Sequence, residues 1–242
     1  MTPAELVAEA HPKIGALGAA FYFAPATLAK GKELGLDGMR FYFLGRGGVL
    51  GDCEPSVVGC AFGYFAPAAV EKLWTSAREV MDPREAGRVY TECAREFGRA
   101  TFGDIDGLDK YCAAAETIID AADAASLPLF AGLAAEPLSD DAPGRAMQLT
   151  AVLREFRGSA HLAAVRSLNL DPAVAHAIKR PEMVEAFGYP DPPTITDADQ
   201  ALLDEAEVRT DAMVLPAFSA LDAGGAEALM AGLDAMTAAV DG

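Results

Sequence analysis

Basic residues are scarce in this sequence. Its 242 residues include 19 Lys and Arg against 36 Asp and Glu, which gives a formal net charge of −17. Proteins that bind DNA or RNA draw much of their affinity from Lys and Arg side chains that neutralise phosphates. The basic residues here form no tight cluster along the chain. We therefore expect no nucleic acid among the partners, and an acidic surface that keeps the protein soluble or attracts a cationic ligand.

Histidine and cysteine are also rare, and the short motifs of metal and nucleotide chemistry are missing. The three His and four Cys include no CxxC pair and no HExxH motif, so no dedicated metal site is expected. The four cysteines are expected to be ordinary reduced thiols. A GxSxG elbow, a P-loop and a dinucleotide fingerprint are absent as well. We predict a protein that works without a metal or an organic cofactor.

Long hydrophobic runs are absent too. No uncharged apolar stretch reaches the roughly 18 residues that a membrane-spanning helix needs. Residues 1–9 contain two glutamates and no basic cluster before an apolar run, unlike a secretory signal. These features predict a cytoplasmic protein that does not enter a membrane.

Apolar residues, in contrast, make up 52% of the chain, which is enough for a large core. Alanine is abundant and runs of β-branched residues are short, so helices are expected throughout. Pro25, Pro67 and Pro172 stand at places typical of a first helical turn. Thr196 with Asp199 resembles a capping box at the start of a long helix. The sequence predicts an all-α fold.

Two segments look like copies of one helix-turn-helix unit. Residues 29–46 and 161–180 each contain a predicted helix, an LxLD motif and a second predicted helix. Gly35 and Asn169 occupy the same place in the two motifs, where a left-handed residue ends the first helix. In both copies an Arg follows the Asp of the motif by nine residues. The alternative is chance similarity, since short motifs arise easily in an Ala-rich chain.

The second helix of each copy lacks the side chains that recognise DNA. Recognition helices present Arg, Lys, Asn or Gln to the groove, whereas residues 38–44 are mostly aromatic and apolar. Residues 173–180 offer only three basic or imidazole side chains. We therefore predict two helix-turn-helix-like halves, 1–135 and 136–242, that pack into one helical protein and keep the architecture without the DNA-reading role.

The stretch 41–65 has the most unusual composition. It combines an aromatic run, an arginine beside glycines, the acidic pair Asp52 and Glu54, and a second aromatic cluster. Two carboxylates beside apolar walls are expected to have at least one raised pKa, which suits a general base. We predict Asp52 and Glu54 as a catalytic acid/base pair. The alternative is that they only cap the helix that begins at Pro55.

Five further residues are predicted to bind the substrate. Arg46 is suited to hold an anionic group through two parallel hydrogen bonds, and a structural salt bridge is its alternative. His161 shares a predicted helix face with apolar residues, which favours a packed, hydrogen-bonded histidine over a ligand-binding one. The tyrosines expected to line the same cavity are Tyr22, Tyr42 and Tyr64.

Several short motifs carry a family resemblance. They are YFAP at 22–25, GLDG at 35–38, Arg46 followed by LG at 50–51, FAP at 65–67, RGSAHLAA at 157–164 and LDEAEVRTD at 203–211. In these motifs the chain resembles a family of actinobacterial helix-turn-helix-like proteins, most of which have no assigned function. The resemblance implies an all-helical, winged-helix-derived fold, here with a reduced wing between Phe187 and Thr196. The family pattern around Asp52 and Glu54 is usually apolar or small.

The resemblance also suggests a reaction. Small helical proteins act beside a sulfotransferase in some biosynthetic pathways to aziridine-containing amino acids, and similarity to them implies ring closure. Asp52 or Glu54 would then take a proton from an amine while a sulfate ester departs. We predict a cofactor-independent enzyme of specialised metabolism that acts on a small, cationic, amine-bearing substrate. Its predicted partner is a sulfotransferase-like enzyme or a second copy of the chain in a homodimer.

Two other classes of function stay open at this point. A ligand-binding or sensor protein would hold a lipid or a porphyrin such as haem in an apolar helical cavity, with His161 as the axial ligand. An interaction protein would dock a partner enzyme on an apolar stripe near the C-terminus, formed by Leu229, Leu233, Met236 and Val240.

Overall fold

The computed structural model describes all 242 residues as helices and connecting segments, with no strand. The elements are α1 (Pro3–Leu17), α2 (Pro25–Glu33), α3 (Gly38–Gly47), η1 (Gly48–Leu50), α4 (Pro55–Phe62), α5 (Pro67–Arg78), α6 (Pro83–Phe102), α7 (Leu108–Ala121), α8 (Pro128–Ala134), α9 (Ala142–Ser167), α10 (Pro172–Lys179), η2 (Pro181–Met183), α11 (Asp197–Phe218) and α12 (Ala223–Asp241). The predicted all-α fold is confirmed. None of these helices combines the length and the apolar character needed to span a membrane.

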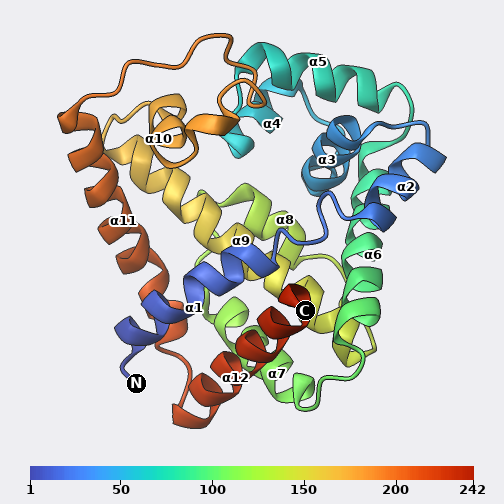
Figure 1. Cartoon of the computed structure of the whole chain (residues 1–242), viewed down its shortest axis with the longest axis vertical. Coiled ribbons are helices and arrows are strands. Elements are labelled where there is room, and N and C mark those ends of the chain that lie inside the picture. The colour runs from blue at the N-terminus through green and yellow to red at the C-terminus, as the bar shows by residue number, and fades with distance from the viewer.

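Helix α9 lies at the centre of the molecule (Figure 1). It is the longest helix, with 26 residues, and it packs against α1, α6, α7, α8 and α11. Small and apolar residues occur on most of its faces, and 16 of its residues are buried. A helix that is apolar on nearly all sides is expected in the interior of a large domain. Helices α6 and α11 flank it on opposite sides, so α9 joins the two edges of the fold.

One hydrophobic core extends through both predicted halves. It contains 49 buried residues, from Leu6 in α1 to Met236 in α12. The predicted boundary between residues 135 and 136 falls in the segment that joins α8 to α9. Helices from both sides of that boundary contribute to the same core, so the halves are separate along the chain but not in space. A second cluster of six residues packs α10 and α11 against the end of α9.

The two helix-turn-helix units contain the same turn. Gly35 and Asn169 have φ values of 81° and 56°, the left-handed conformation expected at these positions. The next residue in each turn donates its backbone N–H to the carbonyl five residues earlier, at 2.8 and 3.3 Å. Asp37 and Asp171 then cap α3 and α10 through their side chains. The repeated LxLD motif thus forms one type of connection twice.

Other local signals are confirmed as well. Pro25, Pro67 and Pro172 each occupy the first turn of a helix. Thr196 and Asp199 form both hydrogen bonds of a capping box at the start of α11. The segment between Phe187 and Thr196 contains no strand.

The apolar stripe of α12 packs inside the protein. Leu229, Leu233 and Met236 are fully buried in the main core, and only Val240 is exposed. The alternative that this stripe docks a partner enzyme is therefore contradicted, because α1 and α7 already cover it.

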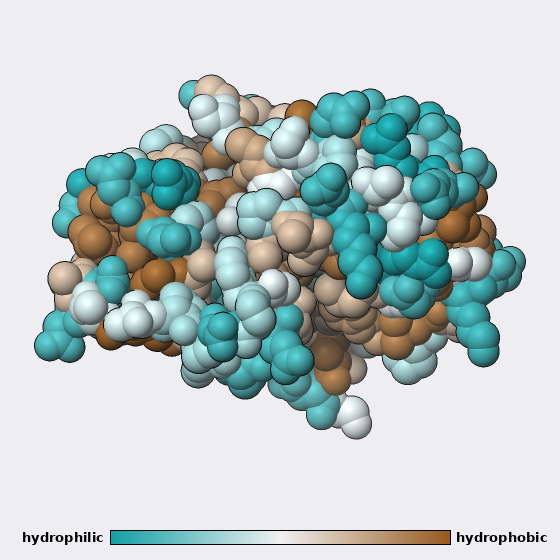
Figure 2. Space-filling view, turned by 90° about the horizontal axis from the view of Figure 1, so that it is seen from above, coloured by the Kyte–Doolittle hydropathy of each residue, from teal (hydrophilic) through white to brown (hydrophobic).

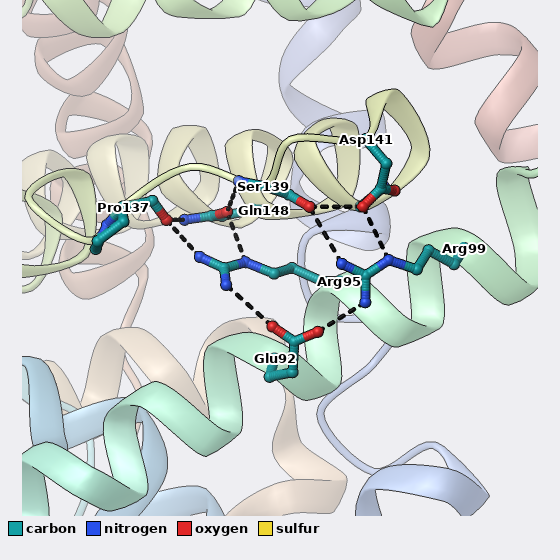
Figure 3. A network of polar contacts seen from close by, with 8 residues as sticks. Glu92, Arg95, Arg99, Pro137, Ser139, Asp141 and Gln148 are labelled. Carbon is teal, nitrogen blue, oxygen red and sulfur yellow. Dashed lines mark hydrogen bonds and ion pairs between the residues drawn. The ribbon is translucent and has the colours of Figure 1, made fainter.

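A polar network fixes α6 to the start of α9 (Figure 3). Glu92 accepts hydrogen bonds from Arg95 and Arg99, at 3.0 and 2.7 Å. Arg99 also binds Asp141, the residue that caps α9, and Arg95 binds the side-chain oxygen of Gln148. The buried Gln148 amide in turn donates to a loop carbonyl at 2.9 Å. Because all of these groups have partners, the network is a structural clamp.

Gly48 marks a place where the backbones of η1 and α6 approach too closely for a side chain. A Cβ atom there would overlap the carbonyl oxygen of Pro83 and lie 2.8 Å from the backbone nitrogen of Gly87. We expect Gly48→Ala to lower the free energy of unfolding by more than about 2 kcal/mol, measured by urea denaturation, because backbone would have to move.

The matched control is Gly15→Ala in the last turn of α1, where a Cβ would meet nothing within 4 Å. This variant should gain about 0.5–1 kcal/mol from the better helix propensity of Ala. Wild-type stability in Gly48→Ala would contradict the close approach of η1 to α6.

Candidate functional site

A large cleft opens between α1, α3, α4, α9 and α10. Its volume is about 780 Å³, within the range of small-molecule sites, and 18 of its 30 lining residues are hydrophobic. Elsewhere, hydrophilic residues cover most of the surface seen from above, with hydrophobic residues in separate patches (Figure 2). We call this cavity the basic cleft, for the charged residues described next.

The wall of the basic cleft carries positive charge although the protein is strongly acidic. All three histidines of the chain line it, and no Asp or Glu does. Glu155, Glu207 and Asp211, which lie outside the wall, pair with four of its five cations and leave the cleft positive. This wall favours an anionic ligand and not the cationic substrate predicted from the sequence. The five cationic residues are Arg46, Arg154, Arg157, Lys179 and Arg180.

A buried ion pair lies beneath the cleft. Nε and Nη2 of Arg46 donate to the two carboxylate oxygens of Glu155, both at 2.8 Å. The Tyr22 hydroxyl donates to the same carboxylate at 2.9 Å, and the Tyr42 hydroxyl accepts from Nη1 of Arg46 at 3.2 Å. Burial alone would raise the pKa of Glu155, but the charges of Arg46 and Arg154 and these hydrogen bonds hold that pKa at about 2. Arg46 therefore has the structural salt bridge that was its alternative role.

His161 is neutral and its tautomer is determined by its neighbours. Burial, together with the charges of Lys179 and Arg157, lowers the pKa of His161 to about 3. The Thr210 hydroxyl donates to a backbone carbonyl of α11 at 2.6 Å, so its oxygen accepts from Nδ1–H of His161 at 3.0 Å. Nε2 consequently carries a lone pair, and the nearest carboxylate oxygen, from Glu207, is 3.9 Å away. His161 is both the packed, hydrogen-bonded residue that was favoured and part of the cleft wall.

His11 is a cleft residue that the sequence did not indicate. Its Nδ1 lies 2.8 Å from Nε of Arg157, and a guanidinium group can only donate, so Nδ1 accepts. The proton of the neutral ring is therefore on Nε2. Burial and the charge of Arg157 lower the pKa of His11 to about 4, against the opposite effect of Asp211. His11 and Arg157 are 146 residues apart in the sequence, so no local pattern connects them.

Three buried polar atoms of cleft residues have no hydrogen-bond partner. They are Nε2 of His11, the hydroxyl oxygen of Tyr64 and the hydroxyl oxygen of Ser159. The Tyr64 ring lies nearly parallel to His161, with 6.5 Å between centroids, and 6.1 Å from the ring of His176. These atoms have almost no accessible surface of their own, so they lie behind the surface of the cleft wall, where no other protein group pairs with them.

The structure does not bring Asp52 and Glu54 to the cleft. Both are exposed and neither lines it. Asp52 pairs with Arg78 at 3.5 Å, and Glu54 precedes α4 without a side-chain capping bond. The carbonyl of Cys53 between them accepts from Trp74 and Arg78, which hold this loop on α5. The neighbouring aromatic side chains turn into the core, so proximity in sequence does not become proximity in space.

The other predicted site residues do come together. Arg46, Tyr22, Tyr42, Tyr64 and His161 all line the basic cleft. Their role in binding a substrate stays a prediction, and the pair Asp52 and Glu54 has no geometric connection to them.

Comparison with known proteins adds one finding. A family model described as a helix-turn-helix family matches residues 7–190, which include both helix-turn-helix units. This confirms the sequence resemblance at the level of that motif family. No curated protein and no solved structure matches the chain.

The two neutral histidines make the stability of the fold depend on pH. Their folded-state pKa values are about 4 for His11 and about 3 for His161, against 6.5 for an unperturbed histidine, so the unfolded chain binds more protons below pH 6.5. We expect the free energy of unfolding to fall between pH 6.5 and 5 by up to about 1.4 kcal/mol per pH unit for each histidine. Urea denaturation at a series of pH values measures this slope.

The variant His161→Gln isolates one contribution, because it keeps a side chain able to bind Thr210 but has no group that titrates. Its unfolding free energy should fall less steeply with decreasing pH than that of the wild type. An identical slope in the two proteins would show that His161 is not held neutral.

Proposed function

We propose that this chain, which belongs to the helix-turn-helix family, binds a small organic anion in the basic cleft and acts on it by cofactor-independent acid/base chemistry. The observation that carries the proposal is the cleft wall, which five cations and three histidines line on a protein of net charge −17. Only three carboxylates, all behind the wall, pair with these five cations, so positive charge is in excess there. The outer surface repels anions, so this wall concentrates attraction for an anion in one place. The aromatic residues of the cleft, among them Phe62, Phe65 and Phe187, suit an apolar body on the ligand.

The proposal includes no nucleic acid, although helix-turn-helix motifs in many proteins place their second helix in the major groove. In the first unit that helix is α3, whose residues Phe41, Phe43 and Leu44 are at most 1% exposed and support the core. In the second unit it is α10, which buries its alanines and pairs Lys179 with Glu207. Neither helix presents a row of free polar side chains to base edges.

His161 is the residue that we propose as proton acceptor. In the ring closure suggested by the resemblance, an amine nitrogen bonds to the carbon that carries a sulfate ester. The C–O bond breaks, sulfate leaves with the electron pair, and the ammonium proton passes to Nε2 of His161. A bound anion beside the ring favours the imidazolium form, so the ligand itself raises the basicity of this histidine.

The cations of the cleft stabilise the departing sulfate, as expected for preorganised positive charge. His161 replaces Asp52 and Glu54 in this proposal because it lines the cleft and they do not. A sulfotransferase-type enzyme is the class of enzyme that would supply the sulfate ester, and the product would contain a small nitrogen ring such as an aziridine.

Two fluorescent probes of similar size test the charge preference. They are the anion 8-anilinonaphthalene-1-sulfonate and the neutral N-phenyl-1-naphthylamine. We expect the protein to bind the sulfonate more tightly by about tenfold or more, because the cations of the wall favour the negative group. Fluorescence titration of each probe measures the two dissociation constants.

Three variants locate the binding. Arg180→Gln should weaken sulfonate binding about fivefold, as expected for about 1 kcal/mol from one largely solvated charge, and leave the neutral probe unchanged. Arg88→Gln removes the same charge from an exposed position outside the cleft and should change neither. Gly158→Leu fills open space in the cleft wall and should weaken both. Equal affinity for the two probes, or displacement of the sulfonate by random duplex DNA, would contradict the proposal.

Haem is a second candidate ligand, favoured by one observation. Nδ1 of His161 is tied to Thr210, and this leaves Nε2 as a free neutral donor of the kind that binds haem iron. The propionates of haem are anionic, as the basic wall requires. Titration with haemin should then give a shifted Soret band that His161→Gln abolishes. An unchanged haemin spectrum in the presence of the protein would eliminate this candidate.

A further inference from the structure

One positive centre of the basic cleft lies beside the buried ion pair. Arg46 and Arg154 both bind the Glu155 carboxylate, at 2.8 and 3.2 Å, so two cations share one counter-ion. The Arg154 side chain is 30% exposed, and its guanidinium lies 5.0 Å from the centroid of the Tyr22 ring. Nε and Nη1 of Arg154 donate to Gly15 and Tyr22, which both line the cleft. Its Nη2 has no partner in the protein and is not among the buried atoms, so it is available to a ligand. We call this group the inner centre.

A second positive centre lies where α10 packs on α9. Arg157 and Lys179 share the Glu207 carboxylate, and Asp211 is a further partner of Arg157. Arg180 follows Lys179 at the end of α10, is exposed and forms no ion pair. Burial, with the charges of Arg157 and Arg180, lowers the pKa of Lys179, so these cations act on one another. We call this group the outer centre, and it too has one cation more than it has paired carboxylates.

The proposed proton acceptor belongs to the outer centre. Nε2 of His161 lies 3.9 Å from the Glu207 carboxylate, the counter-ion that Arg157 and Lys179 share. The charges of the same two cations, after burial, lower the pKa of His161. An acidic group of a ligand at the outer centre therefore lies beside the group that takes up the proton.

Helix α9 presents both centres to the cleft along one face. Five of its residues that line the cleft follow one another at positions i, i+3, i+4, i+7 and i+8, namely Arg154, Arg157, Gly158, His161 and Leu162. At a rise of 1.5 Å per residue, the step from Arg154 to His161 covers about 10 Å. A Cβ added to Gly158, between these two residues, would meet nothing within 4 Å, so the wall is open there. The cleft thus has room for a ligand body that extends from one centre to the other.

We propose that the ligand of the basic cleft carries two acidic groups, one bound by Arg154 at the inner centre and the other by the cations of the outer centre. This inference rests on the proposed function and deepens it, because it names the substrate class as a small compound with two separated acidic groups. In the ring closure described above, the sulfate ester occupies the outer centre beside His161. The second acidic group, such as a carboxylate, stays at the inner centre and anchors the part of the substrate that does not react.

Three naphthalene compounds with the same apolar body test this inference. They are naphthalene-2-sulfonate, naphthalene-2,6-disulfonate with its acidic groups at opposite ends, and naphthalene-1,8-disulfonate with both at one end. We expect the 2,6-disulfonate to bind about tenfold more tightly than the monosulfonate, because only it reaches both centres. The 1,8-disulfonate should bind more weakly than its isomer, although it has the same charge. Displacement of 8-anilinonaphthalene-1-sulfonate from the wild-type protein measures the three affinities.

Substitutions at the two centres should have different effects. Arg154→Gln leaves Glu155 paired with Arg46, so the buried carboxylate keeps a counter-ion. This variant should lose about tenfold in affinity for the 2,6-disulfonate and keep the wild-type affinity for the monosulfonate, which the outer centre binds. Arg154→Lys keeps the charge and should retain the tighter binding of the 2,6-disulfonate. Arg180→Gln should weaken both compounds about fivefold, and the control Arg88→Gln, outside the cleft, should change neither.

The outcomes separate this inference from the proposed function. Equal affinity of the wild type for the monosulfonate and the 2,6-disulfonate overturns the inference, and so does equal affinity for the two disulfonates, which would reduce the gain to charge alone. Equal losses for the monosulfonate and the 2,6-disulfonate in Arg154→Gln would show a single anion site and overturn it as well. In each of these cases the proposed function still stands if 8-anilinonaphthalene-1-sulfonate binds more tightly than the neutral probe.

Discussion

The bidentate ion pair between Arg46 and Glu155 joins the first helix-turn-helix unit to the central helix. Only 3% of the Glu155 side chain and 14% of the Arg46 side chain are exposed. Loss of Glu155 would leave the buried Arg46 guanidinium without its counter-ion, at a cost of about 3–5 kcal/mol. The pair also sets the positions of the Tyr22 and Tyr42 hydroxyls, which bond to it. Since both tyrosines line the basic cleft, the shape of that cleft depends on a charge pair beneath it.

The helix-turn-helix units serve here as building elements of a core. Helix α9 is at once the first helix of the second unit, the axis of the fold and one wall of the cleft. Helix α3 carries aromatic side chains where a DNA-reading helix carries polar ones, and these aromatic side chains are buried. A motif that elsewhere exposes its second helix to a DNA groove here turns that helix inward, and residues of both units line the basic cleft.

Local features of this fold were predictable from the sequence and distant ones were not. Turns at Gly35 and Asn169 and the capping box at Thr196 depend on residues within one helical turn, and all are as predicted. The grouping of Arg46 with tyrosines in one cavity was also anticipated. The contact of His11 with Arg157 arises only from the packing of α1 on α9, and no spacing rule reveals it. Asp52 and Glu54 stood beside aromatic residues in sequence, but the chain alternates between core and surface within a few residues there.

The packing of α1 sets an order for assembly. Its apolar face, with Leu6 and Ile14, is covered by α9, α11 and α12, and the last two lie far along the chain (Figure 1). During synthesis on the ribosome, α1 emerges long before the helices that hold it in place. The cleft wall that carries His11 is therefore completed among the last parts of the fold. A nascent chain therefore has no finished cleft until α11 and α12 have left the ribosome.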